Sequence, residues 1–365
     1  MPLANITKQF QFEGTVETIK PLTDGLINDT FLLKTQGDSP DYILQRKNKK
    51  IFKEIPAMME NILKVESHLK NKIIAAGGDP EREALTLIKT NSGKLYYIDN
   101  EGEYWTACLF IDNTVSYLKA DSLELAEQGG KGIGMFQAML SDMEGTLTDI
   151  LPGFHNIRFR LDQWDKVLEK DPVGRKSQVQ KEINVIEKGR EEMLAFWHEV
   201  ESGKIPIRVT HNDTKISNIL FDKQTNDVLC VIDLDTVLSS TCLNDYGDAI
   251  RSYANASVED DENLNNVYLR MDMFEAYTKG YLSQAVSFLT PNEIKYIAFS
   301  AKYITYEQAL RFLMDYIDGD NYYKINSEIH NLVRTRAQIK LLQSMEEHYN
   351  DMCAVVERLV EKSKK

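Results

Sequence analysis

The chain has 365 residues, 42% of them hydrophobic, which is more than one hydrophobic core usually serves, so two folded domains or lobes are expected. Its 43 Lys and Arg residues against 56 Asp and Glu residues give a net charge of -13, which argues against broad binding to nucleic acid or to an anionic membrane. No apolar run is as long as a membrane helix, which needs about eighteen residues, and no signal peptide is visible, so a cytoplasmic protein is expected.

The first 112 residues predict a small antiparallel sheet that is interrupted by one helix. The helix is predicted over residues 56–76, because apolar side chains recur every three or four positions between Met58 and Leu69. Pro56 suits the first turn of a helix, and Gly77 suits its end. Short β-type runs bounded by turns predict strands at residues 10–13, 16–20, 30–35, 41–45, 85–89, 94–98 and 104–111.

Beyond residue 112 the pattern changes to long helices. The predicted helices cover residues 123–140 and 177–201 and, with breaks, the stretch from 244 to the end; a strand at 206–210 and a β-hairpin over 218–232 lie between them. The sequence therefore predicts an α+β protein. A mainly antiparallel β lobe, residues 1–112, is expected to bind a nucleotide, and a mainly helical lobe, residues 113–365, to carry the chemistry.

The segment after the strand at 206–210 has the residue spacing of a phosphotransfer site. His211 and Asp213 form a His-x-Asp pattern, Asn218 follows five residues after the Asp, and Asp233 comes at the far end of the hairpin. In such a site the first Asp takes the proton of the attacking hydroxyl, while the Asn and the second Asp hold Mg²⁺ against the nucleotide phosphates. A hairpin with one ligand at each end can bring the two together.

Each polar residue of this segment is assigned a role. Asp213 is predicted to contact the acceptor hydroxyl and take its proton, and Lys215 to neutralise charge on the transferring phosphoryl group. Besides the two metal ligands, Asp235 is either a further ligand or a residue that orients the site. His211 is expected to brace the loop by hydrogen bonding rather than to exchange protons.

A turn near the N-terminus, residues 22–31, is a candidate for the phosphate-binding turn of a nucleotide site. Gly25, Asn28 and Thr30 lie in it, where backbone amides could approach the phosphates. The turn has one glycine and matches neither a Walker loop nor Gly-x-Gly-x-x-Gly, so a plain hairpin is the alternative.

Other nucleotide contacts are predicted further along the first lobe. Arg46 lies where a kinase places a basic residue on its third strand to hold the α and β phosphates, and Glu60 on the next helix is its predicted partner, with Glu66 as a competitor. Phe110 and Ile111, where the two lobes join, are candidates for contact with adenine. A solvated charge or an apolar strand end is the alternative at each position.

These motifs together resemble the aminoglycoside phosphotransferase and choline kinase superfamily. The resemblance is carried by residues 209–218 and 231–237, and it is extended by residues 25–31, 44–46, 154–156 and 311–316. It implies a two-lobed protein-kinase-like fold, ATP and Mg²⁺ as cofactors, and direct in-line transfer. Within the superfamily the chain is most similar to kinases that phosphorylate the anomeric C1 hydroxyl of N-acetylglucosamine or N-acetylgalactosamine.

The sequence departs from protein kinases in two ways. Asp233-Leu234-Asp235 stands where those enzymes have Asp-Phe-Gly, and no Ala-Pro-Glu element follows, so a protein substrate is not expected. An anomeric hydroxyl is more acidic than an ordinary alcohol, which suits a carboxylate base such as Asp213.

A sugar site requires planar polar groups and an aromatic face, which the C-terminal helices offer. Arg311, Tyr316, Tyr322 and Arg334 are predicted to bind the N-acetylhexosamine, with His155 as a second candidate edge; helix packing or an ion pair is the alternative for each. Another small alcohol as acceptor, such as a different sugar, an amino alcohol or an aminoglycoside, stays open, as does a binding module without activity. No nucleic acid, membrane or obligate protein partner is expected.

Overall fold

The computed structural model describes residues 2–22 and 27–363, and the chain divides into two compact units. Neither unit is one stretch of sequence. The first combines Met1–Ser116, Asp142–Leu151 and Asn218–Ser239, and the second combines Tyr117–Ser141, Pro152–Ser217 and Ser240–Lys365. The sequence predicted two contiguous lobes that meet at residue 112, whereas the hairpin between Asn218 and Asp233 belongs to the unit that contains the N-terminal sheet.

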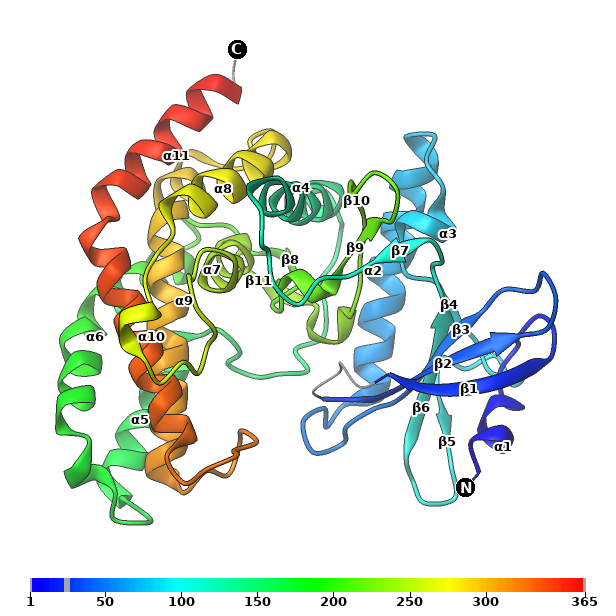
Figure 1. The fold of residues 1–365 in the computed structure, drawn as a ribbon, viewed down its shortest axis with the longest axis horizontal. Coiled ribbons are helices and arrows are strands. Elements are labelled where there is room, and N and C mark those ends of the chain that lie inside the picture. The colour runs from blue at the N-terminus through cyan, green and yellow to red at the C-terminus, as the bar shows by residue number, and fades with distance from the viewer. Residues whose placement is uncertain (1, 23–26, 364–365) are drawn as a thin grey trace. The chain divides into compact units, whose positions relative to one another are not determined.

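The larger sheet of the first unit confirms the predicted antiparallel arrangement (Figure 1). Its strand order is β1-β2-β3-β6-β4, and β5 pairs with β6. The strands are β1 (Val16–Leu22), β2 (Asp29–Thr35), β3 (Tyr42–Arg46), β4 (Leu87–Ile88), β5 (Tyr97–Ile98) and β6 (Tyr104–Leu109).

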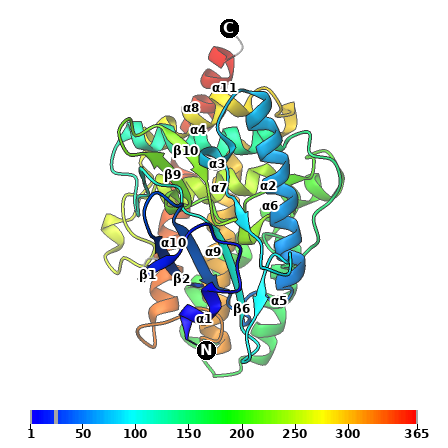
Figure 2. The same ribbon diagram turned by 90° about the vertical axis from the view of Figure 1, so that its right-hand side faces the viewer.

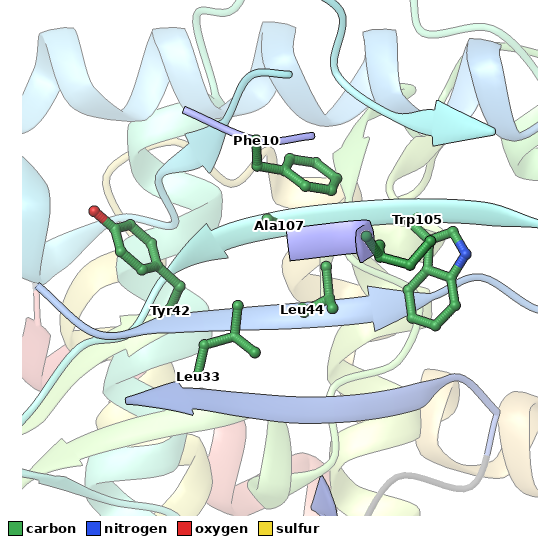
Figure 3. Packing of buried hydrophobic residues seen from close by; sticks show 7 residues of the cluster. Phe10, Leu33, Tyr42, Leu44, Trp105 and Ala107 are labelled. Carbon is green, nitrogen blue, oxygen red and sulfur yellow. The ribbon is translucent and has the colours of Figure 1, made fainter. Parts of the chain in front are cut away.

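A buried apolar cluster covers one face of this sheet. It also includes the short helix α1 (Leu3–Thr7), and its members are Ile6, Phe10, Leu33, Tyr42, Leu44, Trp105 and Ala107 (Figure 3). Alternate side chains of a strand share a face, which is why Tyr42 and Leu44 of β3 both enter the cluster. The same alternation directs Ile43 and Gln45 to the opposite face.

The helix α2 (Ile55–Ala75) confirms the helix predicted over 56–76, and it lies beside the sheet (Figure 2). The backbone N–H of Leu87 in β4 donates to the Glu66 carboxylate at 3.3 Å, which links helix and sheet. Gly77 follows the helix with φ of +80°, a conformation that glycine adopts without steric cost. The short helix α3 (Pro80–Glu83) comes next.

The predicted hairpin is also confirmed. β9 (Ile219–Asp222) and β10 (Val228–Val231) pair antiparallel, and β7 (Thr114–Val115) adds to β9 as a third strand. In the turn, the Asp222 carboxylate accepts from two backbone N–H groups at 2.8 and 3.0 Å. The segments around the hairpin are η2 (Ile216–Asn218), η3 (Leu234–Thr236) and β11 (Leu238–Ser240).

The second unit is mainly helical, as predicted. Its elements are α4 (Leu123–Leu140), α5 (Ile157–Lys170), η1 (Lys176–Gln178), α6 (Gln180–Glu201), β8 (Arg208–Thr210), α7 (Cys242–Tyr253), η4 (Leu264–Asn266), α8 (Met271–Ala285), α9 (Pro291–Asp318), α10 (His330–Glu347) and α11 (Tyr349–Ser363). No described helix combines the length and hydrophobicity that a membrane span requires.

The centre of this unit is α9, which contacts α5, α6, α7, α10 and α11 (Figure 1). Every residue from Ile297 to Leu313 is buried, including the charged Glu307 and Arg311. Because a buried charge is costly unless it is paired, these two side chains are expected to have a specific role.

The helices α4 and α8 approach each other so closely that their backbones touch. A Cβ atom on Gly130 would lie 2.1 Å from the carbonyl oxygen of Tyr277, and one on Gly280 would lie 1.8 Å from that of Glu127. Only glycine fits at such positions. This contact holds α4 in place, and α4 carries side chains that reach the loop after β8.

One predicted element is wrong, and one helix was not predicted. The strand expected at residues 10–13 is absent, and Phe10 makes only an isolated bridge with Thr90. The helix α5 was not predicted, although its signals were present. Asn156 caps it by accepting from the backbone N–H of Phe159, and its buried residues recur at spacings of four and three: Ile157, Leu161 and Trp164.

Candidate active site

The loop that follows β8 is held in place by two carboxylates of α7. Asp245 accepts from the backbone N–H of His211 at 2.9 Å and from that of Asn212 at 2.7 Å. Asp248, one turn along the helix, accepts from the backbone N–H of Thr214 at 3.1 Å. The backbone of the loop is therefore fixed before any substrate binds.

These two carboxylates are in different electrostatic surroundings. Burial raises the pKa of Asp245, although the charge of His211 and the N–H donors oppose the shift. Burial also acts to raise the pKa of Asp248, but the charges of Arg251 and His155 hold it below its ordinary value. Neither residue was predicted to be part of the site.

Asp213 projects from this braced loop and is accessible. Its side chain is 28% exposed and accepts from Lys215 Nζ at 2.9 Å. Its backbone N–H donates to His211 Nδ1 at 3.2 Å, and the His211 ring is completely buried with its edge toward Phe136. His211 therefore braces the loop, as expected, while Asp213 and Lys215 form a carboxylate–ammonium pair that solvent and ligands can reach.

In the first unit, the hairpin brings Asn218 and Asp233 to the same end. The backbone N–H of Ile232 donates to the carbonyl oxygen of Asn218 at 2.9 Å, next to the pairing of Ile219 with Val231. Asp233 has φ of +61°, a left-handed conformation that Asp adopts more readily than most residues, and it turns the chain out of β10.

The oxygen donors of Asn218 and Asp233 suit Mg²⁺, which commonly takes one or two protein ligands and completes its shell with water and substrate phosphates. Among the residues that the structure describes, no group of three or more His, Cys, Asp and Glu side chains could hold a metal ion.

Asp235 belongs to a buried polar network. Its carboxylate accepts from Lys47 Nζ at 2.7 and 2.8 Å and from Asn28 Nδ2 at 2.8 Å. Lys47, only 3% exposed, also donates to Gln45 Oε1 at 2.7 Å, and Gln45 donates to Thr30 Oγ1 at 3.4 Å. Since both oxygens of Asp235 have donors within the protein, the contacts favour an orienting role over metal binding.

Arg46 and Lys47 are adjacent in sequence, but they have different surroundings. Arg46 is in register with Trp105 of the apolar cluster; its Nε donates to Asp29 Oδ2 at 2.7 Å and its guanidinium lies 5.9 Å from the Trp105 ring centroid. The predicted pairing of Arg46 with Glu60 is therefore corrected, because Arg46 pairs with Asp29 while Glu60 is exposed on α2. The buried cation linked to η3 is Lys47, which sequence analysis missed.

The remaining predicted nucleotide contacts are placed as follows. Gly25 lies outside the described residues. Phe110 has Lys34 Nζ at 5.4 Å from its ring centroid, and Ile111 is 6% exposed. Glu66, the competing acid, pairs with Lys70 at 2.8 Å.

In the second unit, Arg311 is surrounded by aromatic rings. Its guanidinium carbon lies 5.5 to 5.7 Å from the ring centroids of Phe154, Tyr322 and Tyr323, and Nη1 donates to Gln308 Oε1 at 3.3 Å. Arg311 is 8% exposed, whereas Tyr322 is 59% exposed. The structure thus brings two of the predicted acceptor-binding residues together, with a planar cation beneath an accessible ring.

Two other predicted acceptor contacts have different neighbours. Tyr316 is 4% exposed and lies under the guanidinium of Arg175, with 4.5 Å between guanidinium carbon and ring centroid, so a sugar contact is not supported there. Arg334 lies over Phe312 at 5.4 Å and donates to the backbone oxygen of Lys324 at 3.1 Å.

His155 is 4% exposed and both of its ring nitrogens face protein groups. Nδ1 lies 2.8 Å from Glu307 Oε2, and Nε2 lies 3.4 Å from the carbonyl oxygen of Asn212. Burial acts to raise the pKa of Glu307, but the charges of His155, Arg311 and Arg160 hold it at about 2. His155 thus contacts the braced loop, and its contact with the acceptor stays a prediction.

Comparisons with known proteins agree with this arrangement. The sequence model of the phosphotransferase enzyme family (APH) matches residues 18–281. A microcompartment-associated aminopropanol kinase is similar in structure, with a TM-score of 0.62 at 12% identity over 96% of this chain and 98% of that chain. A choline kinase from Cryptosporidium parvum gives 0.56 at 14% identity over 98% of both chains. Spectinomycin phosphotransferase in complex with ADP and spectinomycin gives 0.53 at 14% identity over 99% of this chain and 97% of that chain. At these identities the structural likeness establishes the fold alone, which is the predicted protein-kinase-like one.

Proposed function

The chain belongs to the phosphotransferase enzyme family, and from this premise we propose that it transfers the terminal phosphoryl group of ATP to the C1 hydroxyl of an N-acetylhexosamine. The products are the sugar 1-phosphate and ADP. The observation that carries the transfer is the accessible Asp213–Lys215 pair on a loop whose backbone is already fixed by buried carboxylates. The choice of acceptor rests on the sequence resemblance to N-acetylhexosamine 1-kinases and on the surroundings of Arg311.

Asp213 receives the hydrogen bond of the C1 hydroxyl and takes its proton as the new bond to phosphorus forms. Phosphoryl transfer through a loose transition state needs little from a base until late, so a carboxylate next to an acidic anomeric hydroxyl is sufficient. Lys215 neutralises charge on the transferring group. Asn218 and Asp233 would hold Mg²⁺, which when bound offsets the negative charge of the phosphates.

The buried network of the first unit supports a role in nucleotide binding. Lys47 is the cation that we assign to the phosphates; Asp235 holds its ammonium group in position, and Asn28 donates to Asp235. Thr30 and the turn that contains Gly25 stay proposed as phosphate contacts, and Phe110 with Ile111 as adenine contacts.

The surroundings of Arg311 favour a neutral acceptor. A guanidinium can donate to an acetamido oxygen or a ring oxygen, and the exposed ring of Tyr322 offers a flat face to a pyranose. Arg160 lies in the same cluster, and the two arginines would repel an amine. The aminopropanol and choline kinases with similar structures act, by their names, on cationic amino alcohols, so this chain would differ from them in the charge next to its acceptor.

A panel of acceptors tests the proposal. Purified protein, Mg²⁺ and ATP are incubated with N-acetylglucosamine, N-acetylgalactosamine, glucose, ethanolamine, choline and an aminoglycoside, and ADP release is measured for each. Phosphorus NMR then identifies the product, because a C1 phosphate couples to the anomeric proton and a C6 phosphate to a CH₂ group. We expect a C1 phosphate from the N-acetylhexosamines. A C6 product, or turnover confined to amino alcohols, would show that the assigned acceptor is wrong.

The different surroundings of Arg46 and Lys47 lead to a paired prediction at neighbouring positions. Lys47→Met is expected to raise KM for ATP by roughly tenfold to a hundredfold, because a charge-assisted contact with phosphate is lost. Arg46→Met removes the surface ion pair with Asp29 and the contact with the Trp105 ring, and it is expected to change KM for ATP by less than about threefold. Steady-state kinetics with ATP varied, alongside thermal unfolding of both variants, provide the measurement. If Arg46→Met raised KM for ATP more than Lys47→Met, Arg46 and not Lys47 would be the phosphate contact.

A further inference from the structure

The peptide group that joins Asn212 to Asp213 is contacted at both of its polar atoms. The carbonyl oxygen of Asn212 lies 3.4 Å from His155 Nε2, and the N–H of Asp213 donates to His211 Nδ1 at 3.2 Å. A peptide group is planar, so contacts at its oxygen and at its nitrogen together fix the rotation of the plane about the chain. That rotation sets the direction in which the Asp213 side chain leaves the backbone.

The two ring nitrogens of His155 both face hydrogen-bond acceptors. Nδ1 faces a carboxylate oxygen of Glu307 at 2.8 Å, and Nε2 faces the carbonyl oxygen of Asn212. The ring is therefore held between the Glu307 carboxylate on one side and the loop carbonyl on the other. Glu307, buried in the middle of α9, fixes the orientation of the ring.

The backbone at this contact adopts an uncommon conformation. His155 has φ of +54° and Asn212 has φ of +65°, both in the left-handed region that non-glycine residues seldom occupy. Such conformations persist where the surrounding structure imposes them, and they concentrate at functional sites. Here the two residues are the ones that the imidazole ring connects.

We propose that His155 and Glu307 are positioning residues for phosphoryl transfer, acting through the Asn212–Asp213 peptide group to aim the Asp213 carboxylate at the acceptor hydroxyl. Neither side chain is assigned a contact with substrate. The inference rests on the proposed function only in the role of Asp213, and it holds for any hydroxyl acceptor.

Two substitutions of similar length separate the hydrogen bond from simple packing. Gln at position 155 keeps an N–H group that can reach the Asn212 carbonyl, whereas Met has none, and both side chains meet the same backbone conformation. We expect His155→Met to lower kcat by roughly 30- to 100-fold, since small errors in placing a reacting group are costly, with KM for ATP and for the acceptor changed by less than about threefold. His155→Gln should retain a kcat at least about fivefold higher than His155→Met.

A double-mutant cycle tests whether His155 acts through Asp213. In an Asp213→Asn background the carboxylate to be aimed is gone, so adding His155→Met is expected to change the residual rate by less than about twofold. The matched control is His348→Gln at the C-cap of α10, which alters a partly exposed His–carboxylate pair outside the site and should leave kcat unchanged. Glu307→Gln, which keeps an acceptor for Nδ1 but removes the charge, should fall between His155→Gln and His155→Met.

The outcomes distinguish this inference from the proposed function. If wild type makes no sugar 1-phosphate, the function is wrong, and the same cycle is run on whichever acceptor the panel identifies. If wild type turns over but the two substitutions at position 155 have equal effects, or their effects add fully to that of Asp213→Asn, the positioning role is wrong. Hydrogen exchange provides a test that needs no acceptor. The amide of Asp213 should exchange faster in His155→Met than in His155→Gln. Equal exchange rates would contradict the positioning role.

Discussion

Replacing Asp213 by Asn is expected to lower kcat for phosphoryl transfer by at least roughly 10³-fold, near the upper end of what a general base contributes. Asn is nearly the same size and can accept the acceptor hydroxyl's hydrogen bond, but it cannot take the proton. The side chain is partly exposed, and the backbone of its loop is held by Asp245 and Asp248, so the fold is expected to survive. The measurement is ADP release under saturating ATP and acceptor.

Two further measurements make this result specific. Calorimetric binding of ADP should match wild type, because Asp213 is assigned to the acceptor and not to the nucleotide. Asp351→Asn in α11, whose side chain is 74% exposed, is the matched control and should leave kcat unchanged. If Asp213→Asn kept more than about a tenth of wild-type turnover, the carboxylate would be an orienting group and not the base.

Replacing Asp233 by Asn is expected to have the second-largest effect, a loss of roughly 10²–10³-fold in kcat at ordinary Mg²⁺ concentrations. The substitution removes the carboxylate proposed as a metal ligand, leaving two amides to bind a hard cation that prefers anionic oxygen. The Mg²⁺ concentration for half-maximal activity should rise by about tenfold or more, so that high Mg²⁺ restores part of the rate.

The same hairpin provides the control. Asp227→Asn changes an exposed carboxylate in the turn at its opposite end and should affect neither kcat nor Mg²⁺ dependence. Titration of Mg²⁺ into protein with ADP, followed by calorimetry, measures metal-dependent binding apart from turnover. Unchanged Mg²⁺ dependence in Asp233→Asn would remove this residue from the metal site.

Elements whose signals are local could be predicted closely. α2 and α4 have regular apolar spacing, a proline or a capping serine at the start, and few competing signals, so their predicted limits agree with the structure. α5 has the same kind of spacing but many charged residues, and it was overlooked. The segment at residues 10–13 has strand-like composition, yet its place in the cluster beside the sheet is set by packing that the sequence does not display.

The residues of the candidate site also fall into two groups, those related by local spacing and those brought together only by the fold. Asp213, Asn218 and Asp233 are related by spacing within one short stretch, which the sequence shows directly. Lys47 and Asp235 are 188 residues apart, and only pairing between distant segments reveals that they meet. Arg46 is the last residue of β3 and Lys47 follows it, so the choice between them depends on the side to which each side chain points, and a shift of one residue reverses it. His155 and Glu307 are also far apart in sequence, so only the tertiary structure shows that they meet.

The division of the chain into interleaved units has a consequence for its synthesis on the ribosome. The first unit is completed only by the segment Asn218–Ser239, which contributes the buried Ile219 and Phe221. The N-terminal sheet is therefore synthesised well before the hairpin β9–β10, which forms a separate small sheet with β7 in the same unit. An N-terminal fragment ending near residue 112 would lack both proposed metal ligands and part of its own core, so this protein cannot be dissected into halves by a single cut.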